Sequence, residues 1–135
     1  MKLNSYLHFD GDCKQAFEFY AETLGGKLEG VHLWADMPGE DVPPERRDKI
    51  MHASLRVGEE LLMGSDSPPE YYEEPKGFSV TLNIDDATEA ERIFKALARD
   101  GKVSMPFAKT FFAEGFGMVT DRFGIPWMVN CEKPA

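Results

Sequence analysis

The chain has 135 residues and a net charge of −9 at pH 7, so it is most simply one domain, large enough to bury a core of its own. An acidic balance of this kind disfavours binding to nucleic-acid backbones and to anionic membranes, both of which attract clustered Lys and Arg. The sequence shows no apolar run long enough to cross a bilayer and no secretory leader, so we expect a cytoplasmic protein without nucleic-acid or membrane partners.

The first half of the chain predicts one strand, one helix and then three further strands. The apolar periodicity places the first strand, the helix, the second strand and a two-stranded hairpin at residues 3–9, 12–24, 27–34 and 50–64. Asp10-Gly11-Asp12 turns the chain into the helix, and Gly25-Gly26 ends it. The Pro-rich, charged segment 36–49 predicts a surface loop ahead of the hairpin. We expect Cys13, near the helix start, to be a buried free thiol.

The second half follows the same order of elements. The alternation of apolar and polar residues predicts strands at 78–84 and 103–107 and a closing hairpin at 116–130. Asp85-Asp86 precedes a helix with an apolar stripe, which ends before Gly101. The acidic, Pro-rich segment 66–76 between the two halves predicts a solvated linker.

The two halves align with each other as internal repeats. Laying Gly58 on Gly124 places Ile50 on Phe116, and 26–28 aligns with 101–103 without a gap. The sequence therefore predicts an α+β fold of two tandem βαβββ modules, residues 1–65 and 77–135, within a single domain 1–135. Each helix would cover one face of a sheet, while the other faces curve around a cleft. A ferredoxin-like sandwich has too few strands for this pattern.

Three stretches resemble one known family over nearly the whole chain. They are Tyr6-Leu7-His8-Phe9-Asp10-Gly11-Asp12-Cys13, Leu62-Met63-Gly64-Ser65-Asp66 and the segment from Gly117 to Asn130. They are similar to the PhnB-like branch of the vicinal oxygen chelate superfamily, a branch also labelled 3-demethylubiquinone methyltransferase-like. The superfamily includes glyoxalase I, extradiol dioxygenases, and bleomycin and fosfomycin resistance proteins. The resemblance implies the glyoxalase/bleomycin resistance fold, a curved mixed and antiparallel sheet around a cleft, and it does not imply an activity.

The resemblance also implies four positions at which members of the superfamily hold a divalent metal ion. They fall on Asn4, His52, Ser79 and Met128. Only His52 is a good ligand for Zn, Ni or Fe, because hydroxyl and amide groups bind these ions weakly and a thioether prefers soft metals. We therefore expect neither a metal nor another cofactor, although His8 shares a strand face with Asn4 and could join His52 in weak metal binding.

Successive side chains of a strand point to opposite faces of a sheet, and this alternation predicts a polar surface on the sheet faces opposite the helices. We expect a small planar or amphipathic molecule to bind there. The expected ligand contacts are Tyr6, His8, His52, Ser54, Arg56, Thr81, Phe112, Met118 and Met128. A simpler interpretation is also open, because the outer face of an antiparallel sheet is often polar without binding anything.

Other functions remain open at this point, and we assign no catalytic residue. One is a metal-dependent lyase, thiol transferase or dioxygenase, and another is a structural or regulatory dimer whose cleft is filled. No Ser or Cys has a His and a carboxylate at a recognisable spacing, so nucleophilic catalysis has no support. Methyl transfer is disfavoured because no glycine-rich loop follows a parallel strand.

We also expect a symmetric homodimer. Open modules of four strands leave exposed edges, and exposed edges pair with other chains unless they are covered. Two-fold assembly is the commonest arrangement of soluble homo-oligomers, and the resemblance implies the same. The sequence leaves open whether the modules pair within a chain or swap between chains.

Overall fold

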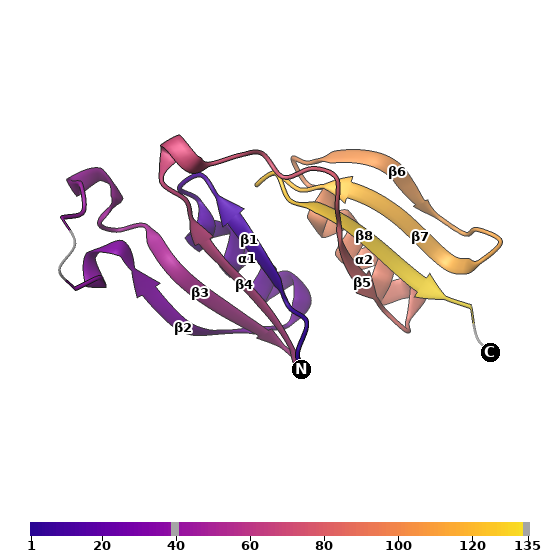
Figure 1. The fold of residues 1–135 in the computed structure, drawn as a ribbon. Helices are drawn as coiled ribbons and strands as arrows, with labels where there is room; N and C mark the ends of the chain where they lie inside the picture. The colour runs from indigo at the N-terminus through magenta and orange to yellow at the C-terminus, as the bar shows by residue number, and fades with distance from the viewer. Residues whose placement is uncertain (39–40, 134–135) are drawn as a thin grey trace. The chain divides into compact units, whose positions relative to one another are not determined.

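The computed structural model describes residues 1–38 and 41–133 and divides the chain into two compact units. Unit 1 is Met1–Glu73 and unit 2 is Glu74–Ala135. Unit 1 contains β1 (Ser5–Phe9), α1 (Cys13–Leu24), β2 (Lys27–Leu33), β3 (Ile50–Val57) and β4 (Glu60–Asp66), with short 3-10 helices at Trp34–Asp36, Pro44–Arg46 and Pro69–Tyr71. Unit 2 contains β5 (Val80–Asn83), α2 (Ala87–Ala98), β6 (Lys102–Ala108), β7 (Ala113–Thr120) and β8 (Pro126–Glu132) (Figure 1). The two predicted βαβββ modules are therefore confirmed.

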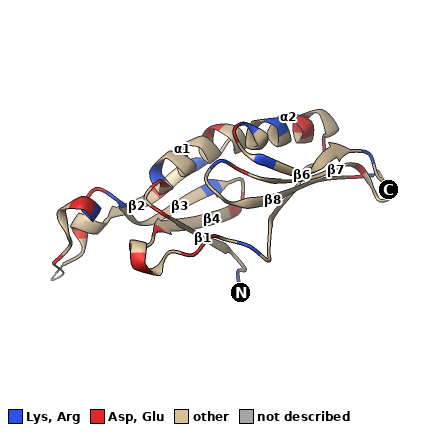
Figure 2. Cartoon of the chain, turned by 90° about the horizontal axis from the view of Figure 1, so that it is seen from above, with Lys and Arg blue, Asp and Glu red and all other residues tan. Residues whose placement is uncertain are grey.

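The two sheets have the same topology. Their strand orders are β1-β4-β3-β2 and β5-β8-β7-β6, and in each sheet the first strand runs parallel to its neighbour while the other pairs are antiparallel. In each unit the helix covers one face of its sheet and leaves the other face open (Figure 2). The α+β class with mixed sheets, predicted from the repeats, is confirmed.

The ends of some elements differ from the predicted bounds. Pairing of the first strand begins at Ser5, opposite Leu62, so the preceding Leu3 lies outside the sheet and is 95% exposed. Pairing of β5 likewise begins only at Val80, opposite Trp127, whereas the sequence placed the strand start two residues earlier. An apolar residue next to a strand extends the alternating pattern even where no partner strand is present, and this explains both differences.

The core of unit 1 lies between α1 and its sheet. Phe17 and Tyr20 of α1 are fully buried, as are Leu7 of β1 and Leu55 of β3. The helix approaches so closely that a Cβ at Gly64 of β4 would lie 2.8 Å from the ring of Phe17. Burying each large side chain contributes about 1.5–3 kcal/mol, so this layer is the main source of stability in the unit. The first helix, predicted from apolar periodicity, is confirmed and buries Ala16, Phe17 and Tyr20 against the sheet.

The core of unit 2 is built around the closing hairpin. Asp121, at the end of β7, is buried and accepts hydrogen bonds from Phe123 N at 2.9 Å, Ile125 N at 3.0 Å and the indole nitrogen of Trp127 at 2.8 Å. These bonds fix the turn and hold the Trp127 ring, which is 1% exposed, against the helix side of the sheet. The predicted cap of α2 is also present, because the Asp86 carboxylate accepts from Glu89 N at 3.0 Å.

A buried carboxylate joins three parts of unit 1. Asp66 is the last residue of β4 and is 3% exposed. One of its oxygens accepts from Gly11 N at 3.0 Å and Cys13 N at 2.9 Å, and the other accepts from Ile50 N at 2.9 Å. Its backbone carbonyl also accepts from the indole nitrogen of Trp34 at 3.1 Å. Asp66 therefore ties the β1–α1 turn and the start of β3 to the end of β4, whereas the sequence had placed it in the linker.

Both cysteines are free and buried, as expected for Cys13. Burial raises the pKa of the Cys13 thiol, and the negative charges of Asp66 and Asp12 raise that pKa further. Desolvation also raises the pKa of Cys131. Both side chains are therefore neutral thiols at physiological pH and contribute to packing. No helix in the described part of the chain is long and apolar enough to cross a membrane.

Replacing the central carboxylate tests its role in stability. Asp66→Asn keeps the side-chain volume but turns one acceptor oxygen into an NH2 group, which would face the N–H of Ile50. We expect the free energy of unfolding to fall by roughly 2–3 kcal/mol, the usual effect of leaving a buried donor unpaired. Urea unfolding followed by circular dichroism measures this change.

Asp86→Asn is the matched control, because Asp86 is exposed, accepts a single backbone N–H and sits at a helix cap where Asn serves equally well. It should change stability by less than about 0.5 kcal/mol. Equal effects of the two substitutions would contradict the role given to Asp66.

Candidate functional site

Polar side chains gather on the open face of the unit 1 sheet. Tyr6 and His8 alternate with the buried residues of β1, so they point away from α1. Strand pairing places Met63 of β4 between Tyr6 on one side and Ser54 of β3 on the other. His52 precedes Ser54 by two residues and shares its face. The order β1-β4-β3 thus brings together four residues that the sequence predicted as ligand contacts.

Three of these side chains form a hydrogen-bonded relay. The Tyr6 hydroxyl lies 3.1 Å from His52 Nδ1, and Ser54 Oγ lies 3.3 Å from His52 Nε2. The rings of Tyr6 and His52 are stacked, with centroids 5.6 Å apart and an interplanar angle of 29°. A neutral imidazole donates one hydrogen bond and accepts one, while each hydroxyl can do either. The relay therefore leaves one hydroxyl hydrogen free to donate, either at Tyr6 or at Ser54.

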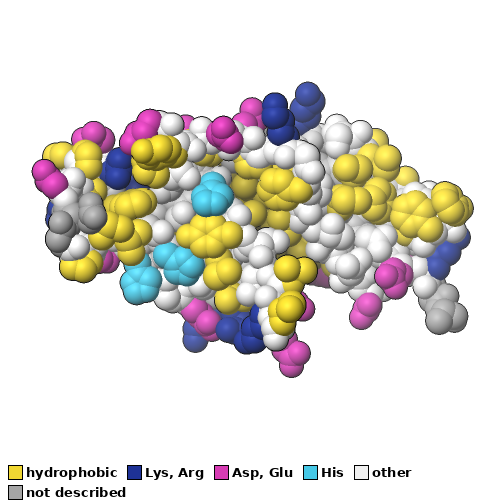
Figure 3. Space-filling view, in the orientation of Figure 1, with side chains coloured by type: hydrophobic (Ala, Val, Ile, Leu, Met, Phe, Trp, Pro, Cys, Tyr) yellow, Lys and Arg dark blue, Asp and Glu magenta, His cyan; other side chains and the backbone are white. Residues whose placement is uncertain are grey.

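The other two histidines of the chain extend this surface. The ring centroids of His8 and Tyr6 are 5.1 Å apart, and His8 Nδ1 lies 3.4 Å from Ser67 Oγ. His32 of β2 is directly opposite His52 of β3 in the strand register. Figure 3 shows all three histidines on one face of the molecule, around a hydrophobic side chain. We call Tyr6, His8, His32, His52 and Ser54 the histidine face.

His32, Met63 and Ser67 were not among the predicted contacts. The register of β2 shifts on both sides of His32, so alternation along the strand does not determine which face this side chain lies on. Met63 lies in the predicted hairpin, but the sequence did not identify β1 as the second neighbour of its strand, and Ser67 fell in the predicted linker. A prediction that β4 lies between β1 and β3 would have found Met63.

Arg56 lies further along β3 and its charge is already paired. Its Nε is 3.2 Å from Oε1 of Glu29 on the neighbouring strand β2. Both side chains are about two-fifths exposed, with 43% and 41% of their surfaces accessible, so the pair contributes little to stability. Arg56 is therefore a member of a neutral pair rather than a free cation for an anionic ligand.

Unit 2 presents its own open face with a different composition. Thr81, Met128 and Met118 form one row across β5, β8 and β7. Asn130 Nδ2 donates to Asn83 Oδ1 at 3.0 Å in a neighbouring row. This face therefore combines small polar groups with two flexible thioether side chains.

The aromatic residues of unit 2 divide between two locations. Phe112 is half-exposed, and its ring is 5.2 Å from that of Phe111 and 5.3 Å from that of Phe116. Phe107 instead packs against Phe94 of α2 with ring centroids 5.6 Å apart. Phe107 is thus a helix-side residue, because β6 contains register shifts that strand parity could not predict.

The residues at the metal positions of the superfamily do not make a metal site. Asn4 is exposed ahead of β1, and both ring nitrogens of His52 already have hydroxyl partners. Ser79 and Met128 contribute a hydroxyl and a thioether, which bind Zn, Ni and Fe poorly. Across residues 1–38 and 41–133, no group of three His, Cys, Asp or Glu side chains is placed to hold an ion. The donor set does not fit the superfamily metal.

Two βαβββ modules with mixed sheets define a protein of the vicinal oxygen chelate fold. The fosfomycin resistance protein FosX from Listeria monocytogenes has this fold, with a TM-score of 0.68 at 7% identity over 98% of this chain and 94% of that one. The model of the family described as 3-demethylubiquinone-9 3-methyltransferase matches residues 1–130. The chain therefore belongs to that family.

Relatives from several bacteria support the assignment over the full length. Protein YjdN from Escherichia coli (strain K12) is 37% identical, with 98% of this chain and 97% of YjdN aligned. The crystal structure of protein PA1353 from Pseudomonas aeruginosa is 50% identical and has a TM-score of 0.91 over 99% of both chains. A Bacillus cereus structure described as a putative 3-demethylubiquinone-9 3-methyltransferase, PhnB protein, has a TM-score of 0.81 at 22% identity, over 97% of this chain and 99% of its own. The predicted PhnB-like resemblance is confirmed.

Proposed function

We propose that this PhnB-like protein binds a small planar or amphipathic molecule on the histidine face of unit 1, without a metal ion. The observation that supports the proposal most strongly is the Tyr6–His52–Ser54 relay. These side chains lie on an open sheet face, where hydrogen bonding to each other is not needed to satisfy buried groups. Ordered polar groups beside an aromatic surface are typical of small-molecule sites.

The relay suits a ligand with both a flat surface and a hydrogen-bonding edge. The stacked rings of Tyr6 and His52 offer an apolar platform against which a planar molecule can pack. The free hydroxyl hydrogen, at either Tyr6 or Ser54, can donate to a carbonyl or similar acceptor. Because Arg56 is paired with Glu29, the face has no unbalanced arginine to favour a strongly anionic ligand.

Unit 2 contributes a second proposed contact surface of its own. Thr81, Met118 and Met128 lie in one row, and Phe112 is half-exposed. Methionine side chains adapt to ligands of different shapes because they are flexible and polarizable. We keep these four residues as proposed ligand contacts.

The family description names a methyltransferase, but the turns of this chain do not favour that activity. A nucleotide-like cofactor normally lies against a glycine-rich loop between a parallel strand and a helix. Here the β1–α1 turn is Asp10-Gly11-Asp12, and the β5–α2 turn ends with Asp85-Asp86. Both turns place carboxylates where such a cofactor needs close backbone contact. Binding, rather than methyl transfer, is therefore the proposed function.

Substitutions on the histidine face test the binding proposal. His52→Ala and Tyr6→Phe should leave the melting temperature nearly unchanged, because both side chains lie on the open face. We expect them to weaken binding of a co-purified ligand, identified by native mass spectrometry, by about 1–3 kcal/mol, since each removes one end of a hydrogen bond. Isothermal titration calorimetry measures the affinity.

Tyr71→Phe is the matched control, because it removes the hydroxyl of a tyrosine that is 76% exposed. It should bind as the wild type does. A large loss of stability in His52→Ala together with unchanged affinity would show that His52 is structural and would refute the proposal.

The cytoplasmic location remains a prediction from the sequence.

We further propose that the protein is a homodimer. The edge strand β6 exposes apolar side chains, among them Val103 at 42% and Met105 at 44%. Unpaired edges with apolar side chains favour association with another chain. A second copy could cover them.

Light scattering tests the dimer directly. At micromolar concentration we expect a mass of about twice the 15.2 kDa of the chain. Adding charge at the edge, as in Val103→Lys, should shift the population toward monomer because a buried unpaired ammonium is costly. A wild-type mass of one chain at these concentrations would contradict the proposal.

A further inference from the structure

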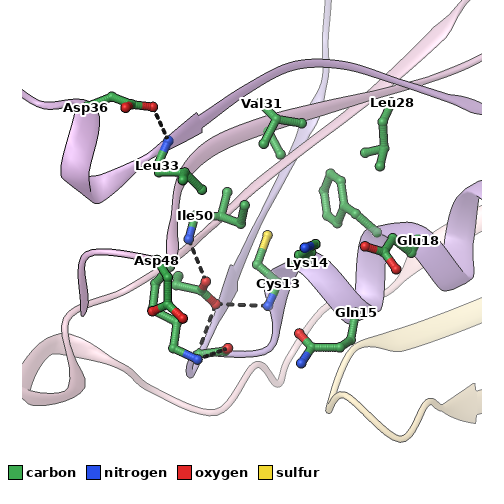
Figure 4. A pocket seen from close by; sticks show the side chains of 15 residues that line it. Cys13, Lys14, Gln15, Glu18, Leu28, Val31, Leu33, Asp36, Asp48 and Ile50 are labelled. Carbon is green, nitrogen blue, oxygen red and sulfur yellow. Dashed lines mark hydrogen bonds between the residues drawn. The ribbon is translucent and has the colours of Figure 1, made fainter. Parts of the chain in front are cut away.

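Unit 1 contains a hollow on the helix side of its sheet, opposite to the histidine face. It has a volume of about 680 Å³ and lies between the first half of α1 and strands β2 and β3. Figure 4 shows Leu28, Val31 and Leu33 of β2 around it, with Ile50 of β3 beside Leu33 and the sulfur of Cys13 on the helix side. The hollow is within the size range of small-molecule sites.

At the Asp66 end of this hollow the buried polar groups already have hydrogen-bond partners within the protein. Both carboxylate oxygens of Asp66 accept backbone N–H groups (Figure 4). The thiol of Cys13 stays neutral because burial raises its pKa. The Lys49 ammonium, at the same end, donates to Gly11 O at 3.1 Å. The apolar part of the lining comes from Phe17, Leu28, Val31, Leu33, Ile50 and Ala53, which an apolar occupant can contact. The polar side chains of Lys14, Gln15, Glu18, Asp36 and Asp48 make up the rest of the lining.

Unit 2 has a hollow at the corresponding position, between its helix and its sheet, and this hollow is smaller. It is bordered by Ala87 and Thr88, the first two residues of α2, just as Cys13 and Lys14 border the hollow beside α1. It measures only about 260 Å³, and Phe107 of β6 lines it.

The ring of Phe107 fills the space between the helix and the sheet in unit 2. It packs against Phe94 of α2, and it lies so close to β7 that a side chain at Gly115 would collide with it. In unit 1, β2 carries no aromatic side chain at all within Lys27–Leu33 apart from the imidazole of His32, which faces the other side. Strand β2 therefore supplies no ring to the hollow of unit 1 as β6 supplies Phe107 to that of unit 2.

We propose that the hollow of unit 1 binds a small uncharged aromatic molecule, whose ring takes the place that Phe107 takes in unit 2. The site is separate from the histidine face, so it does not rest on the function proposed above. The ligand class follows from the repeat itself, because the chain fills the equivalent space with a benzyl group.

Benzyl alcohol is the probe that tests the site, since it carries the side chain of phenylalanine on a soluble group. In methyl-labelled protein we expect saturable shifts of the Leu28, Leu33 and Ile50 methyl signals, with a dissociation constant on the order of 1 mM for so small a ligand. Val31→Phe adds a benzyl group at a half-exposed position beside the hollow and should weaken binding at least tenfold. Leu28→Phe places a ring at the other end of the hollow and should act in the same way.

Two controls separate this site from the rest of the molecule. Val103→Phe makes the same substitution at a similarly exposed valine on the edge strand of unit 2 and should leave binding unchanged. Tyr6→Phe, on the histidine face, should also leave it unchanged. Linear shifts without saturation, or wild-type affinity in both phenylalanine variants of β2, would overturn the proposal. Intermolecular contacts from a second copy to the same methyl groups, in a mixed-label sample, would overturn it as well.

Discussion

The arrangement of unit 1 depends on one buried carboxylate. Asp66 accepts N–H groups from the β1–α1 turn, the first turn of α1 and the start of β3, so three segments are held to the end of β4. Each of these N–H groups would cost about 1–3 kcal/mol if it were buried without a partner. Because β1 and β3 are fixed on either side of β4, the side chains of Tyr6 and His52 meet on the open face. Asp121 has the same role on a smaller scale in unit 2, where it closes the β7–β8 turn and holds Trp127.

Local patterns predicted the elements and faces well. Alternation on β1 placed Tyr6 and His8 opposite the core, and the stripe of α1 identified its buried side, because both depend only on residues that are close in sequence. The register of β2 could not be predicted in this way. Its bulges bring His32 opposite His52, and comparable shifts in β6 turn Phe107 toward α2. The partners of Asp66, up to 55 residues away, likewise depend on the assembled sheet.

The two repeats share a fold. They differ in the side chains that lie between helix and sheet and in the side chains on the open sheet face. Membership of the family fixes the fold, while the residues at the superfamily metal positions have chemistry that does not hold such an ion. His52 is hydrogen-bonded to Tyr6 and Ser54 instead. The function proposed for the protein, recognition by stacking and hydrogen bonding on one sheet face, is consistent with this chemistry.

The central claim, that recognition is independent of a metal, is tested most directly by elemental analysis of protein purified without chelators, combined with affinity measurements before and after dialysis against EDTA. The account predicts well under one divalent ion per chain and the same affinity for the co-purified ligand in both preparations. One tightly held divalent ion per chain, with binding that disappears when the ion is removed and returns when it is restored, would contradict it.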